Sequence, residues 1–135
     1  MDSSLQRLVV SRARAQCEYC RIPQRFDAMP FCFDHIVAQK HHGLTTESNL
    51  AWSCFDCNSY KGPNIAGIDS ETSLVVPLFN PRLMSWEDHF TWNGPILIGR
   101  TAIGRVTIDV LKINDPQRID YWRLLQEEGM FPPNS

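Results

Sequence analysis

The sequence predicts a small α+β domain built around a metal-binding core. Four cysteines form two Cys-x-x-Cys pairs, Cys17/Cys20 and Cys54/Cys57. Strand-like segments lie between the pairs and helical patterns flank them. With 135 residues the chain has the length of one domain. We expect a single domain with three parts: an N-terminal helix in residues 1–16, a metal-stapled core in 17–62, and a short β-hairpin with two helices in 63–135.

Local patterns define the elements of the first half. Leu5, Leu8 and Val9 recur at the spacing of one helix face, which predicts a helix over residues 3–15. The core is then predicted as a strand over 31–37, a polar loop over 38–48, a second strand over 49–53, and a short helix from Cys57 to about Gly62.

The second half has its own signals. Residues 64–73 are predicted as a polar loop and residues 74–79 as a short apolar strand. Asn93-Gly94 is a hairpin turn signal between aromatic and aliphatic segments. Thr101 can cap a helix through Leu111, and Asn114-Asp115-Pro116 predicts the start of a second helix that ends before Gly129.

The charge of the chain is low but unevenly distributed. The formal net charge of −2 argues against strong non-specific binding to nucleic acids. Arginines nevertheless gather near the N-terminus, where they could contact a nucleic-acid backbone without reading its sequence. An ordinary solvated helix face is the alternative interpretation. The candidates are Arg12, Arg14, Arg21 and Arg25.

The cysteine content favours a metal site over disulfides. The N-terminus lacks a basic segment followed by an apolar one, so we expect no secretory signal and a cytoplasmic location. No apolar run approaches the roughly 18 residues of a membrane span. The fifth cysteine, Cys32, is expected to be a buried apolar thiol.

The spacing of the paired cysteines suits a tetrahedral zinc ion bound by four thiolates, Cys17, Cys20, Cys54 and Cys57. Four buried thiols without metal are the alternative. Four protein ligands leave no open position for water, so this zinc should be structural. Any chemistry must therefore come from other residues.

A second set of residues lies between and just after the pairs: Asp34-His35-Ile36, Asn49-Leu50, and Asn58-Ser59-Tyr60-Lys61-Gly62. In this order the set resembles the HNH endonuclease family, strongly over residues 17–62. A weaker likeness extends to residues 80–82 and 86–92. The resemblance implies the ββα-metal fold and a metal-dependent hydrolysis of DNA phosphodiester bonds.

The resemblance also assigns roles. His35 is implied as the general base that activates water, and a histidine ordinarily titrates near neutral pH. Asp34 and Asn58 are implied ligands of one catalytic divalent cation, and their hard oxygen atoms suit Mg²⁺ or Mn²⁺. Asn49 is expected to hold the first loop and to orient His35 by hydrogen bonding.

Further candidates could bind the substrate, namely Lys61, His42 and Arg21. His41 could equally lie on a solvated loop, and His89, among aromatic residues, fits a core-edge position better than a base contact. Two other classes remain open: a zinc-stabilised nucleic-acid-binding module that does not cut, and a protein-interaction domain with a zinc knuckle. Cleavage of both strands would favour a homodimer.

Overall fold

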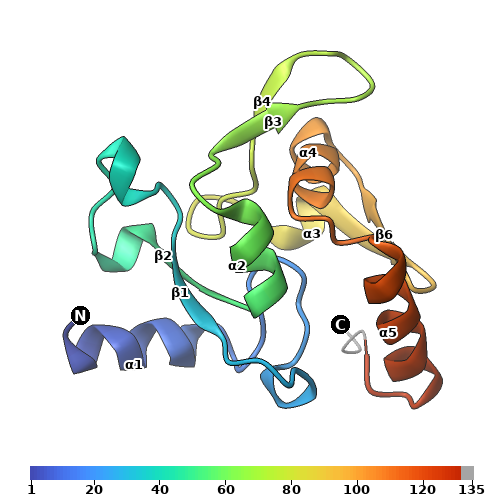
Figure 1. The fold of residues 1–135 in the computed structure, drawn as a ribbon, viewed down its shortest axis with the longest axis horizontal. Coiled ribbons are helices and arrows are strands. Elements are labelled where there is room, and N and C mark those ends of the chain that lie inside the picture. Colours follow the sequence, from blue (N-terminus) through green and yellow to red (C-terminus); the bar gives the residue numbers. More distant parts are fainter. Residues whose placement is uncertain (132–135) are drawn as a thin grey trace.

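The computed structural model describes residues 1–131 and confirms a mixed α+β architecture. Among these residues, β-structure takes the form of three separate two-stranded antiparallel sheets. Helix α2 lies at the centre, with α1 at one side of the molecule and α5 at the other (Figure 1). Across the described range, no helix is both long and apolar enough to cross a membrane.

The N-terminal helix α1 spans Ser3–Arg12 and ends before residue 15, the expected end. Asp2 caps it, because its carboxylate accepts a hydrogen bond from the backbone N–H of Ser4. The chain then turns sharply, with Arg14 and Ala15 both at a φ of 57°. This turn leads directly into the first cysteine pair.

The central sheet pairs β1 (Cys32–His35) with β2 (Leu50–Ser53), close to the predicted strands. In its register His35 lies opposite Leu50, and Asp34 lies opposite Ala51. Every residue of β2 is buried, because α1 packs on this side. Helix α2 (Phe55–Lys61) begins earlier than expected, with Cys54 rather than Cys57 at its start.

The second half contains more β-structure than the sequence predicts. Strand β3 (Ala66–Ile68) pairs with β4 (Val75–Pro77) in a hairpin that extends away from the core (Figure 1). Strand β3 falls in the segment that was expected to be a polar loop. A four-residue helix α3 (Trp86–His89) then leads into the predicted hairpin of β5 (Phe90–Asn93) and β6 (Ile96–Gly99).

Two helices complete the described chain, α4 (Ala102–Val110) and α5 (Pro116–Glu127), both as predicted. Helix α4 packs on β6 and on the β3–β4 hairpin. Trp122 of α5 packs against Trp92 and Phe131 in an aromatic cluster. The indole N–H of Trp86 donates to the carbonyl of Tyr19 at 2.8 Å, which ties the second half to the cysteine-rich turn.

Candidate active site and metal centre

The predicted convergence of the four paired cysteines is confirmed. The sulfur atoms of Cys17, Cys20, Cys54 and Cys57 all lie within 4.8 Å of one another, and all four residues are buried. Cys17 accepts backbone N–H groups from Tyr19 and Cys20 at 3.4 and 3.5 Å. Backbone donors of this kind stabilise thiolates, so the cluster fits a tetrahedral zinc ion.

Arg118 of α5 adds a positive charge to this cluster. Its Nη2 donates to the Sγ of Cys57 at 3.3 Å, and its Nη1 donates to the carbonyl of Leu111 at 2.9 Å. The side chain is 7% exposed. Burial alone would lower the pKa of Arg118, but the neighbouring thiolates, Cys57 first, raise it above its ordinary value. No pattern in the sequence indicated this contact.

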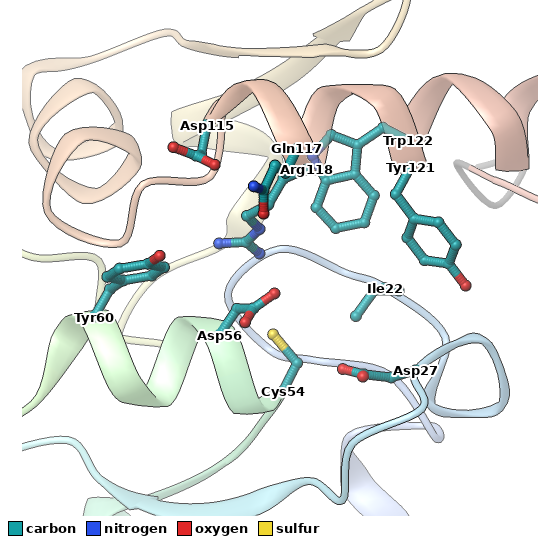
Figure 2. A pocket seen from close by; sticks show the side chains of 10 residues that line it. All are labelled: Ile22, Asp27, Cys54, Asp56, Tyr60, Asp115, Gln117, Arg118, Tyr121 and Trp122. Atoms are coloured by element: carbon teal, nitrogen blue, oxygen red, sulfur yellow. The ribbon is translucent and has the colours of Figure 1, made fainter.

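A pocket of about 260 Å³ lies beside the cluster, between α2 and α5. Figure 2 shows Arg118 reaching from α5 toward Asp56 and Cys54, with Asp27 and Asp115 also on the walls. Burial raises the pKa of Asp27 above its ordinary value. Three carboxylates make this pocket a poor site for a phosphate group.

Asp34 is placed differently from the expectation. Its carboxylate is 4% exposed, accepts the hydroxyl of Tyr19 at 2.6 Å through Oδ2, and pairs with Nζ of Lys61 at 3.2 Å through Oδ1. Burial raises the pKa of Asp34, and Lys61 and Tyr19 oppose this rise. Each oxygen of this carboxylate therefore already has one partner within the protein, and the role of Asp34 as a ligand of a catalytic cation stays a prediction.

Lys61 is also buried, at 1% exposure, although the sequence suggested an exposed contact to phosphate. Its Nζ donates to the backbone carbonyls of His35 and Ile36, both at 3.1 Å, in addition to Asp34. The amine is thus used to fix the end of β1. The expectation of a phosphate contact therefore has no support in this conformation.

His35 lies on the other face of β1 from Asp34, because successive strand residues alternate. The ring is partly exposed, and its Nε2 lies 2.9 Å from the hydroxyl of Thr45. In the tautomer that carries the proton on Nε2, this N–H donates a hydrogen bond to the hydroxyl of Thr45. The Nδ1 atom then keeps its lone pair. Sequence reasoning did not identify Thr45.

Asn49 forms three hydrogen bonds that close the loop after β1. Its Oδ1 accepts the N–H of Val37 at 2.9 Å, and its Nδ2 donates to the carbonyls of Val37 and Leu44 at 3.0 and 2.9 Å. The backbone of Gly43 packs closely against this loop, because a Cβ at position 43 would lie 1.7 Å from the carbonyl oxygen of Val37. The loop so fixed carries Thr45.

The other candidates occupy varied positions. Asn58 is partly buried. The thiol of Cys32 is half-buried rather than buried and lies 4.0 Å from the carbonyl oxygen of Pro30. His41 and His42 are exposed on the turn that follows residue 38. His89 lies at the core edge, with Nδ1 2.6 Å from the hydroxyl of Thr101 and its ring edge-on to Phe79.

The first comparison identifies the class of the cysteine-rich core. The family model for HNH endonuclease matches residues 17–64, so this segment carries the HNH endonuclease motif. The resemblance predicted from the sequence is confirmed over this part of the chain.

The second comparison matches the chain to a bacterial protein. The chain is 26% identical over 112 residues to the Septu protein PtuB of Bacillus thuringiensis, and the match covers 82% of this chain. It covers 41% of the relative, so the chain spans about two fifths of that protein's length. The comparison with solved structures gave no match.

Proposed function

We propose that the protein is an endonuclease that hydrolyses phosphodiester bonds in DNA, with His35 as the general base. The single observation that carries the proposal is the pairing of His35 with Thr45 inside a segment that matches the HNH endonuclease family. The hydroxyl of Thr45 fixes the imidazole, and Nδ1 takes a proton from the attacking water. The partly exposed ring can reach a bound strand.

The cysteine cluster has a structural role in this proposal. A zinc ion bound by Cys17, Cys20, Cys54 and Cys57 joins the turn after α1 to the start of α2. Structural zinc sites of this kind supply on the order of 10 kcal/mol of folding free energy in small peptides. The zinc therefore holds the framework that positions β1, and takes no part in the chemistry.

The resemblance to the family also implies a catalytic cation, expected as Mg²⁺ or Mn²⁺. When bound, such an ion would neutralise charge at the leaving oxygen. Asn58 offers an amide oxygen, but Asp34 is engaged by Tyr19 and Lys61, so we assign no step to the ion. The proposal retains DNA as the partner and the cytoplasm as the compartment.

The proposal is tested with a supercoiled plasmid, by following nicked and linear products with Mg²⁺, with Mn²⁺ or without an added divalent cation. We expect His35→Ala to reduce the rate at least about 100-fold, the lower range for a general base. His41→Ala, an exposed histidine on the neighbouring turn, is the matched control. Equal rates for the two variants, at equal zinc content and thermal stability, would contradict the proposal. DNA binding without cleavage by the wild type would favour the non-catalytic module.

A further inference from the structure

A second pocket, of about 280 Å³, lies between the end of α1, the turn into the cysteine cluster and the segment 79–86. Its walls include Arg12, Arg14 and Arg21. We call this cavity the arginine pocket. Gln16, Glu18 and Trp86 complete the polar part of the lining. The pocket beside the cysteine cluster is acidic, so the two cavities differ in the sign of their charge.

Positive charge in the arginine pocket exceeds the negative charge available to it. Its one carboxylate, Glu18, pairs with Arg82, which is not among the lining residues, and accepts the backbone N–H of Trp52 at 2.7 Å. Burial lowers the pKa of Arg12, and the neighbouring Arg82 lowers it further, whereas Glu18 and Glu47 oppose the change. In a chain of net charge −2, this concentration of guanidinium groups favours an anionic ligand.

Two donor groups in the pocket lack a protein partner. The Nε atoms of Arg12 and Arg21 are buried without a hydrogen bond to any of the residues described. The guanidinium of Arg21 is held over the ring of Trp86, 5.1 Å from its centroid, so its orientation is fixed. Buried donors without partners cost free energy, and both of these belong to arginines that line the cavity.

Backbone strain accompanies this arrangement. Arg14 has a φ of 57° and Arg21 a φ of 70°, in the left-handed region that non-glycine residues rarely adopt. Each such residue lowers the stability of the folded chain. The turn that bears this cost is the segment that brings Arg14 and Arg21 to the same cavity as Arg12.

The arginine pocket lies beside the central sheet of β1 and β2, and β1 carries His35. Arg12 donates to the carbonyl of Leu50 at 2.7 Å, and Leu50 lies opposite His35 in the sheet register. One strand spacing, about 4.8 Å, therefore separates the backbone that Arg12 contacts from the backbone of His35.

We propose that the arginine pocket binds a phosphate group of the nucleic-acid backbone beside the cleavage site. The proposal rests on the proposed function for its choice of ligand. Guanidinium groups match the geometry of phosphate oxygens and often bind them through two parallel hydrogen bonds. The contact positions the strand and reads no bases.

The test measures binding of a labelled DNA duplex by His35→Ala protein without added Mg²⁺ or Mn²⁺, so that cleavage cannot interfere and the zinc site is left intact. Arg14→Gln/Arg21→Gln is compared with Arg7→Gln/Arg25→Gln, which removes the same charge from exposed positions of the same N-terminal segment. We expect the pocket variant to raise Kd at least about 10-fold and to reduce the slope of log Kd against log salt by about 1 per lost contact. The control should change both much less.

Three further results distinguish the possibilities. Equal Kd values for the two double variants, at equal zinc content and melting temperature, would overturn the proposal. Displacement of DNA by millimolar inorganic phosphate or a mononucleotide would identify a site for free phosphate and overturn it too, as would equally tight binding of polyglutamate. Pocket-dependent DNA binding without cleavage by the wild type would support the pocket while refuting the nuclease.

Discussion

Arg118 donates a hydrogen bond to the sulfur of Cys57 at 3.3 Å and so joins α5 to the cysteine cluster. Four thiolates carry more negative charge than a divalent ion neutralises, and a buried guanidinium offsets part of the excess. We expect Arg118→Met to weaken zinc binding about 10- to 100-fold, the range for residues that hydrogen-bond to metal ligands.

The measurement is zinc release to a colorimetric chelator. Arg123→Met is the matched control, since Arg123 lies on the same helix and pairs with Asp120 at the surface. Equal release from both variants would show that Arg118 only anchors α5.

Thr45 should position the imidazole of His35. We expect Thr45→Val to lower kcat about 3- to 10-fold without raising KM, because one hydrogen bond contributes about 0.5–1.5 kcal/mol. Thr45→Ser keeps the hydroxyl and should restore most of the rate. Thr46→Val is the neighbouring control, since that hydroxyl meets Ser48. A rise in KM alone would point to substrate binding.

Asn49 should determine the stability of the loop after β1. Asn49→Ala removes three hydrogen bonds, so amide exchange in residues 37–45 should become faster while exchange in α5 is unchanged. Gly43→Ala should have the same effect by the clash with Val37. Asn64→Ala, at an exposed position, is the control. Unchanged exchange in both loop variants would refute this role.

Lys61 should act on stability rather than on phosphate binding. Lys61→Met leaves the buried carboxylate of Asp34 without its cation, which should lower the free energy of unfolding by about 3–5 kcal/mol. Adding Asp34→Asn should recover part of this loss. Urea unfolding measures both, with exposed Lys40→Met as the control. A raised KM at unchanged stability would instead support the phosphate contact predicted from the sequence.

Asp69 should contribute stability that disappears in acid. Hydrogen bonds from Arg105, at 3.0 Å to each carboxylate oxygen, hold the pKa of Asp69 well below its ordinary value of 3.8. A carboxyl with a lowered pKa in the folded state stabilises the protein fully above its unfolded pKa, and this contribution is lost as the pH falls below it. The stability difference between wild type and Asp69→Asn should therefore shrink from pH 6 to pH 2.

Thermal unfolding across that range is the measurement. Glu71→Gln provides the comparison, because Glu71 contacts the same arginine at 2.6 Å but is 63% exposed. Solvent screens that pair, so its removal should change little at any pH. A pH-independent effect of Asp69→Asn would show that the hydrogen bonds act without regard to charge.

Some of the fold was predictable because its causes are local. The Cys-x-x-Cys spacing directs two thiolates to one point whatever surrounds it. Asn114-Asp115-Pro116 begins α5 through the fixed φ of proline. Strand β3 was missed because Ala66-Gly67-Ile68 lacks an alternating pattern. Its Gly67 lies against Val106 and Val110 of α4, a contact made only in the folded chain.

The candidate site was predictable in its members and less so in their partners. The positions of His35 and Asn49 follow from the motif. The pairing of Asp34 with Tyr19 and Lys61 depends on how α2 packs on β1, and the residues that meet are up to 27 positions apart. The contact of Arg118 with Cys57 spans 61 positions. Sequence spacing carries no information about such encounters.

The outer edge of β2 has a consequence for association between copies. Three of its outward backbone groups are already paired within the chain: Arg12 and Arg82 donate to the carbonyl of Leu50, and Glu18 pairs with both the N–H and the C=O of Trp52. An edge whose backbone groups are paired in this way is a poor template for an incoming strand. Pairing of two copies of the chain through this edge of β2 is therefore disfavoured.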